Sequence, residues 1–131
     1  MVDTTRRIPL RDAVVAAFSL LVLFVGVVHE VVGSTLYPEG PDKFGGPIGW
    51  HAAGIGLVFL GSALLSSTLG FTRFPIRIPA AAVSLAGLFI TVQEFIQNGR
   101  FHLFAATLLV CGGAIAFLHQ PRSGKGSSPA A

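Results

Sequence analysis

Residues 12–34 read DAVVAAFSLLVLFVGVVHEVVGS, a run in which only Asp12, His29 and Glu30 are ionisable. A helix rises about 1.5 Å per residue, so a stretch of this length crosses the roughly 30 Å hydrocarbon core of a bilayer. The rest of the chain has the same character, since 52% of its 131 residues are hydrophobic and 11% are charged. This composition is typical of an integral membrane protein and not of a soluble domain.

Three more apolar segments follow in the chain, at residues 49–69, 79–98 and 101–118. Pro47 and Pro79 stand near the start of the first two of these segments, and Gly70 and Gly99 follow their ends, as is usual for helix boundaries. Because only two or three residues separate the last two segments, these must pair in antiparallel fashion. We therefore predict an all-α fold, an up-down-up-down bundle of four transmembrane helices.

The distribution of Lys and Arg predicts how this bundle is oriented. Positive residues near span ends stay preferentially on the cytoplasmic side. The chain has nine Lys and Arg residues, of which two, Lys43 and Arg100, fall on one side of the predicted membrane. The other seven share the opposite side, and these are Arg6, Arg7, Arg11, Arg73, Arg77, Arg122 and Lys125. We expect both termini to be cytoplasmic and the protein to be multi-pass in the plasma (inner) membrane.

The predicted organisation has three parts. Residues 1–11 form a basic cytoplasmic tail, residues 12–119 form the bundle, and residues 120–131 form a second cytoplasmic tail rich in Ser, Gly, Pro and Ala. The net charge of +3 comes largely from the inside-facing segments, so it indicates topology and attraction to anionic lipid. The partners expected are the lipid bilayer and either a second copy of the chain or a protein of a membrane complex, and no nucleic acid.

Five ionisable residues define the candidate site. In an up-down-up-down bundle the end of the first helix, the start of the second, the end of the third and the start of the fourth share one membrane face. Those four places hold, in chain order, His29 with Glu30, then His51, Glu94 and His102. Ionisable groups at membrane depth are costly and rare, and by default they indicate a functional site.

Imidazole and carboxylate groups together are a common ligand set for zinc, iron or copper. We therefore expect an extracytoplasmic metal site centred on His51, Glu94 and His102, completed by Glu30 or His29. The two adjacent residues lie about 100° apart on a helix, so both cannot point at the bundle axis. Haem held by two of the histidines is a weaker expectation, because carboxylates lie beside them.

The Pro- and Gly-rich segment 37–48 is predicted to be a shaped loop over the outer end of the bundle. Tyr37 and Trp50 flank this loop, either as interfacial aromatic residues or as walls of the site. Asn98, one helical turn after Glu94, is the third predicted wall residue.

Several alternatives to a metal site remain open at this stage, and one is a small enzyme that uses His and Glu as acid and base on a lipid or quinone at the outer leaflet. The acids and imidazoles can simply satisfy one another and stabilise the outer end of the bundle. The protein can be a non-catalytic accessory subunit of a membrane complex, with the cluster structural. It can also move small cations coupled to protons, with Glu30 as the proton-binding group.

A short stretch of the sequence resembles a known family of transporters. Residues 30–36, EVVGSTL, resemble the first-helix signature of the small multidrug resistance transporters, four-helix proteins of similar length. The resemblance implies that Glu30 alternately binds protons and a cationic drug. In that family, however, the Glu lies near the middle of the membrane without a neighbouring histidine, whereas Glu30 follows His29 near a helix end. The third-helix aromatic pattern of that family is also absent from residues 79–98.

Overall fold

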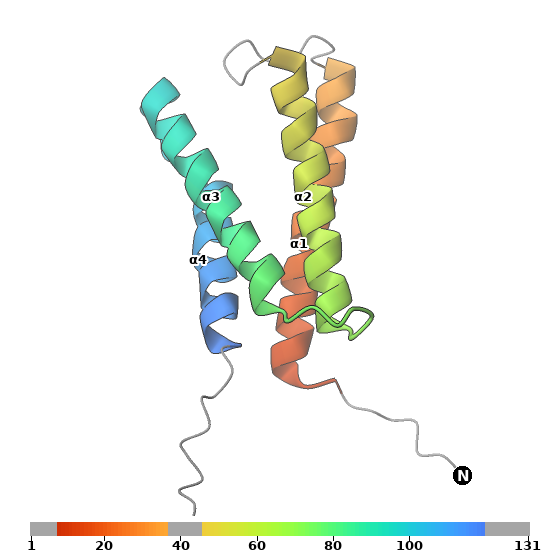
Figure 1. Cartoon of the computed structure of the whole chain (residues 1–131). Helices are drawn as coiled ribbons and strands as arrows, with labels where there is room; N and C mark the ends of the chain where they lie inside the picture. The colour runs from red at the N-terminus through yellow and green to blue at the C-terminus, as the bar shows by residue number, and fades with distance from the viewer. Residues whose placement is uncertain (1–7, 37–45, 120–131) are drawn as a thin grey trace, which may run out of the picture.

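The computed structural model describes residues 8–36 and 46–119, and it confirms the all-helical prediction with four helices in that part of the chain. These are α1 (Leu10–Leu36), α2 (Gly46–Thr68), α3 (Arg77–Asn98) and α4 (Leu103–Leu118) (Figure 1). Of Gly33, Ser34, Leu36 and residues 46–50 only the backbone is described. Tyr37, the tail 120–131 and residues 1–7 lie outside the described residues.

Three of the four helices are long and apolar enough to cross a membrane. The candidate spans are Leu10–Val32, His51–Thr68 and Arg77–Asn98. The fourth helix, α4, is equally apolar but has only 16 residues, which corresponds to about 24 Å at the α-helical rise. Length and composition therefore indicate a membrane protein.

The helices form two antiparallel hairpins, α1 with α2 and α3 with α4 (Figure 1). Contacts within each hairpin are extensive, whereas α2 and α3 touch over a much shorter stretch. The hairpins lie close where α2 connects to α3 and diverge toward the opposite end (Figure 1). The helices of the predicted bundle are therefore packed unevenly: they are closely paired within each hairpin and contact one another much less between the hairpins.

Glycines allow the backbones within each hairpin to approach closely. A Cβ atom added at Gly61 of α2 would lie 2.6 Å from the Leu23 backbone nitrogen of α1. In the other hairpin, a Cβ atom at Gly112 would lie 2.7 Å from the backbone nitrogen of Ser84. Ser84 also ties α3 to α4, since its hydroxyl donates to the Leu109 carbonyl at 2.8 Å. Small residues at contacts are what membrane helices need, because lipid provides no hydrophobic drive for their association.

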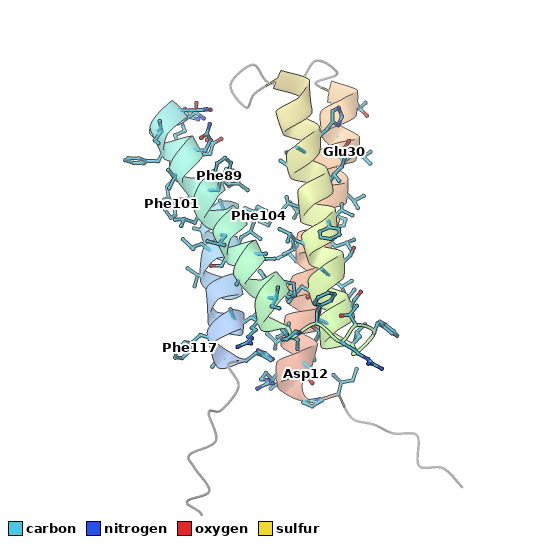
Figure 2. All side chains as sticks on the ribbon, viewed as in Figure 1. Asp12, Glu30, Phe89, Phe101, Phe104 and Phe117 are labelled. Carbon is cyan, nitrogen blue, oxygen red and sulfur yellow. The ribbon has the colours of Figure 1, made fainter. Side chains whose placement is uncertain are left out.

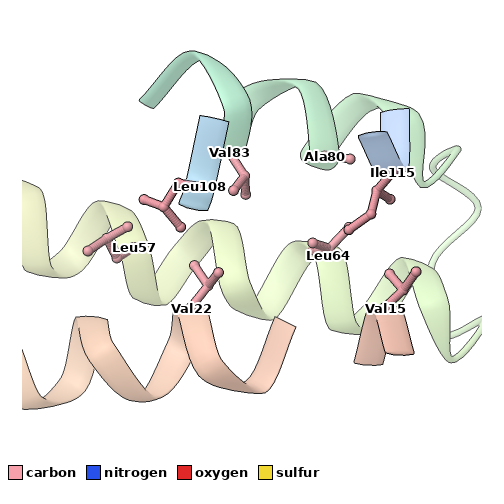
Figure 3. Close-up of a cluster of buried hydrophobic side chains, with 8 residues drawn as sticks. All are labelled: Val15, Val22, Leu57, Leu64, Ala80, Val83, Leu108 and Ile115. Carbon is pink, nitrogen blue, oxygen red and sulfur yellow. The ribbon is translucent and has the colours of Figure 1, made fainter. Parts of the chain in front are cut away.

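A small apolar core joins the two hairpins (Figure 3). Its members come from all four helices and are at most 9% exposed: Val15, Val22, Leu57, Leu64, Ala80, Val83, Leu108 and Ile115. Large apolar side chains instead cover the outside, with Phe59 71% and Phe89 66% exposed (Figure 2). Small and medium side chains inside with large apolar ones outside suit a lipid environment.

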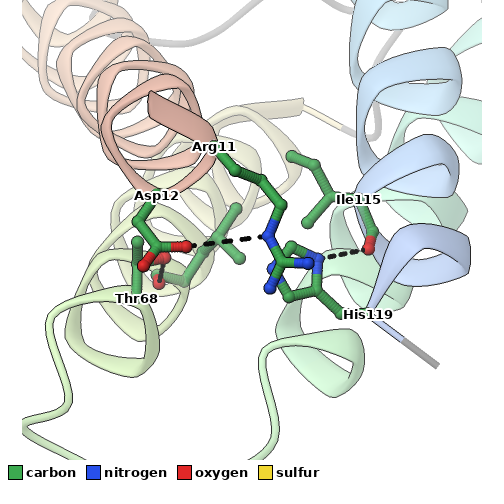
Figure 4. Close-up of polar contacts among 6 residues, drawn as sticks. Arg11, Asp12, Thr68, Ile115 and His119 are labelled. Atoms are coloured by element: carbon green, nitrogen blue, oxygen red, sulfur yellow. Dashed lines mark hydrogen bonds and ion pairs between the residues drawn. The ribbon is translucent and has the colours of Figure 1, made fainter. Parts of the chain in front are cut away.

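The end at which α1 begins and α4 ends has its own polar contacts (Figure 4). Arg11 Nε lies 3.7 Å from Asp12 Oδ1, and the Thr68 hydroxyl donates to the Leu64 carbonyl at 2.7 Å. His119 Nδ1 donates to the Ile115 carbonyl at 2.9 Å. His119, at the C-terminal end of α4, thus adds a side-chain hydrogen bond to a carbonyl in the last turn of that helix.

Candidate functional site

Glu30 and His51 form the tightest polar contact between α1 and α2. His51 Nδ1 donates to Glu30 Oε1 at 2.5 Å, with the two side chains 38% and 32% exposed. Glu30 lies on the last turns of α1 (Figure 2), and His51 lies in the first turns of α2. Since Nδ1 carries the donated proton, Nε2 of a neutral His51 is an acceptor. The predicted gathering of first-helix and second-helix residues therefore occurs for this pair.

Gly54, one turn after His51, explains how both residues of the adjacent His29–Glu30 pair reach α2. A Cβ atom at Gly54 would lie 2.7 Å from Glu30 Oε2 and 3.0 Å from His29 Nδ1. Both polar atoms thus occupy the space that a side chain at position 54 would fill. The helical angle between the two residues prevents both from facing the bundle axis, but it does not prevent both from touching the neighbouring helix.

Glu94 and His102 belong to the second hairpin and make local contacts. Glu94 Oε2 accepts a hydrogen bond from Asn98 Nδ2 at 2.8 Å. His102 is the N-cap residue of α4, and its Nδ1 accepts from the Ala105 backbone N–H at 3.3 Å. A side-chain acceptor at this position satisfies one of the unpaired N–H groups of a helix start. The sequence pattern does not predict this capping role of His102.

A cavity of about 590 Å³ lies between the diverging hairpins and collects the other predicted residues. His29, Glu94 and His102 line it, while Glu30 and His51 are not part of its wall. The remainder of the wall is apolar and includes Ala53, Ile90 and Phe104 as well as aliphatic residues of α1 and α2. Volume and composition are those of a typical small-molecule site, which is concave, apolar and equipped with a few polar groups.

The five predicted ligands therefore fall into two overlapping groups. One is the contact of Glu30 with His51, beside His29, and the other is the cavity with His29, Glu94 and His102. In residues 8–36 and 46–119, no three His, Cys, Asp or Glu side chains are placed so that they could hold a metal ion. The expectation of one site shared by all five residues stays a prediction, and the divergence of the hairpins is the reason that the structure does not assemble it.

The predicted wall residues have different outcomes. Asn98 contacts Glu94 but is absent from the cavity wall. Tyr37 and the side chain of Trp50 are outside what the structure describes. Sequence reasoning missed Ala53, Ile90 and Phe104, because nothing distinguishes an apolar cavity residue from an apolar lipid-facing one until the hairpins are placed.

Comparison with known protein families finds no match for this chain, and comparisons with curated proteins and with solved structures find none either.

Proposed function

We propose that this protein spans the plasma membrane four times, with both termini in the cytoplasm, and binds a lipid-soluble molecule in the cavity between its two hairpins. The apolar part of that molecule lies against Ala53, Ile90 and Phe104. Its polar part lies near Glu94 and His102. In this arrangement α4 crosses the membrane despite its 16 residues, because a short span is accommodated by local thinning and by flanking residues that reach the interface.

The cavity is the observation that carries this proposal. Its wall draws on all four helices, and most of its residues lie within the segments long and apolar enough to cross a membrane. The outside of the same helices is covered with exposed apolar side chains, so a molecule that reaches the cavity comes from lipid. Three titratable side chains in an otherwise apolar wall supply the few polar contacts that orient a ligand.

Filling the cavity tests the proposal. Ala53→Phe places a ring in the cavity wall, and we expect it to weaken binding of an apolar probe such as radiolabelled 4-decylphenol at least tenfold. Ala52→Phe is the matched control, because Ala52 precedes it in α2, is exposed and is absent from the wall. Scintillation proximity measurements on protein in lipid nanodiscs report both affinities. Equal binding by the wild type and both variants would contradict the cavity as the binding site.

A metal ion held between α1 and α2 is the second candidate, and the surroundings of Gly54 favour it. Here His29 Nδ1 and Glu30 Oε2 both lie beside Gly54, and Glu30 contacts His51. These groups are suitable ligands for zinc, iron or copper, but the three side chains would have to rearrange to surround an ion. Binding requires the hydrogen bond between Glu30 and His51 to open, because both of its atoms would become ligands. Transport of cations and an accessory role in a membrane complex stay predictions, because no contact among the described residues favours either of them.

Elemental analysis of detergent-purified protein checks this second candidate. If the metal site exists, we expect about one equivalent of zinc, iron or copper in the wild type and its loss in Glu30→Gln, which removes a charged ligand but keeps the side-chain shape. The control is Glu94→Gln, because Glu94 belongs to the other hairpin. Absence of stoichiometric metal after purification without chelators, or metal that survives Glu30→Gln, would rule out this site.

A further inference from the structure

The two hairpins repeat one another in their closest contacts. A Cβ atom at Gly26 of α1 would meet, in α2, the Val58 nitrogen, the Leu57 Cβ and the Gly54 carbonyl. A Cβ atom at Gly87 of α3 would meet the same three atom types in α4, which are the Leu109 nitrogen, the Ala105 carbonyl and the Leu108 Cβ. The second set is the first shifted by 61 residues in the odd-numbered helices, from 26 to 87, and by 51 in the even-numbered ones, from 58 to 109.

The same two shifts relate the other contacts and the core. Gly61 of α2 corresponds to Gly112 of α4. Gly61 approaches Leu23 and Gly112 approaches Ser84, and these two residues also occupy equivalent positions. The buried core residues form equivalent pairs at these shifts, namely Val22 with Val83, Leu57 with Leu108, and Leu64 with Ile115. Each hairpin is therefore one copy of a two-helix unit, and the cavity lies where the two copies diverge.

The repeat makes His51 and His102 equivalent positions, yet their rings act in opposite ways. His51 Nδ1 donates to Glu30, whereas His102 Nδ1 accepts from the Ala105 N–H. The reason is the residue at the position equivalent to Glu30, which is Thr91, whose hydroxyl donates to the Gly87 carbonyl of its own helix. With its Nδ1 lone pair engaged, a neutral His102 carries its proton on Nε2 and is a hydrogen-bond donor.

The acceptor at the cavity is Glu94, one helical turn beyond Thr91. Asn98 donates to Oε2 of Glu94, so this carboxylate is used as an acceptor in the structure, and a carboxylate has acceptor capacity beyond one hydrogen bond. His102 and Glu94 line the same cavity. On the side of the second hairpin, the cavity wall thus combines one N–H donor and one carboxylate acceptor with apolar side chains, and His29 faces the cavity from α1.

From this pairing we infer that the molecule bound in the cavity carries a hydroxyl group, which accepts from His102 Nε2–H and donates to Glu94. The inference rests on the proposed function and names its ligand class, an apolar body such as an alkylphenol or a long-chain alcohol with one hydroxyl. An ether of the same body can accept from His102 but has no proton for Glu94. The methyl group of the ether would then displace water from Glu94 without supplying a donor in its place, which is unfavourable.

The test compares 4-decylphenol with 4-decylanisole, its methyl ether, as competitors of radiolabelled 4-decylphenol on the full chain in nanodiscs. We expect the wild type to prefer the phenol at least tenfold. Glu94→Gln, which replaces the charged carboxylate with a neutral and weaker amide acceptor, should reduce this preference to less than threefold. His102→Asn should weaken both competitors to a similar degree, because both accept from His102; Asn is a good N-cap residue but is too short to place a donor where the imidazole does. His119→Asn, at the opposite end of the molecule, is the control and should keep the wild-type preference.

The outcomes separate the two proposals. Equal affinities of the wild type for phenol and anisole, both lost in Ala53→Phe, would overturn the hydroxyl inference and leave the cavity as a binding site. A wild-type preference that persists in Glu94→Gln, or affinities for both competitors that His102→Asn leaves unchanged, would also overturn it. Binding of neither probe, or binding unaffected by Ala53→Phe, would overturn the proposed function itself. Should His102→Asn fail to fold, Glu94→Gln alone decides the inference.

Discussion

Replacing Gly87 with leucine is expected to separate α3 from α4 and to destabilise the protein by about 3 kcal/mol or more, the upper range for overpacking. A Cβ atom at this position would lie 2.6 Å from the Ala105 carbonyl oxygen and even closer to the Leu109 nitrogen. Both are backbone atoms of a facing helix, so no side-chain rotation relieves the overlap. Leucine gains about 1 kcal/mol in helix propensity over glycine, which is too little to offset the clash.

The loss is measured as the thermal unfolding midpoint of detergent-purified protein and as the monodisperse fraction in size-exclusion chromatography. Gly61→Leu should behave like Gly87→Leu, because a Cβ atom there would meet the backbone of Leu23. Gly56→Leu is the matched control in α2, since a Cβ atom at Gly56 meets nothing within 4 Å. If Gly56→Leu proved as destabilising as Gly87→Leu, helix packing through these glycines would not be what holds the hairpins together.

A cysteine at position 101 is expected to react with a membrane-impermeant maleimide on intact cells, and a cysteine at position 71 only after lysis. Phe71 and Phe101 are suitable sites because they are 79% and 70% exposed and lie in the connections at opposite ends of the hairpins. Cys111, the single cysteine of the chain, is first replaced by alanine. The expected difference in labelling is all-or-none, because the reagent does not cross the membrane.

The physical reason is the distribution of arginine among the described residues. Arg11, Arg73 and Arg77 lie at the end where α1 begins and α2 connects to α3, whereas Arg100 lies at the end bearing the candidate site (Figure 1). Arginines close to span ends are retained in the cytoplasm. Labelling of position 71 on intact cells, with position 101 protected, would reverse the proposed orientation. Labelling of both would contradict a membrane-spanning arrangement.

Much of the candidate site followed from helix periodicity and antiparallel pairing. Counting alternate directions along four apolar segments placed His51 near the end of α1, and the structure brings it into contact with Glu30. The same reasoning placed Glu94 and His102 at that end, and both line the cavity there. Helix periodicity does not predict that these residues divide between two groups. It indicates which residues lie near the same end of the bundle, but not how far apart the two hairpins lie.

The role of His102 as an N-cap and the repeat of the two hairpins illustrate the same limit. The shifts of 61 and 51 differ because the second hairpin has a shorter connection and a shorter first part of its second helix than the first hairpin, so no single sequence period reveals the repeat. Only the atoms that face each glycine show which positions correspond.

The amino-acid sequence alone determined that this chain forms four apolar helices, approximately where each begins and ends, and that five of its acids and imidazoles lie toward one end. These are properties of short stretches, set by hydropathy, helix length and breaking residues. The tertiary structure alone decided that the helices pair as two hairpins that diverge, that Glu30 meets His51 beside Gly54, and that a cavity opens between the pairs. Those features depend on which small residues of one helix face the backbone of another, and on how far two apolar surfaces separate, and neither is encoded in any single segment.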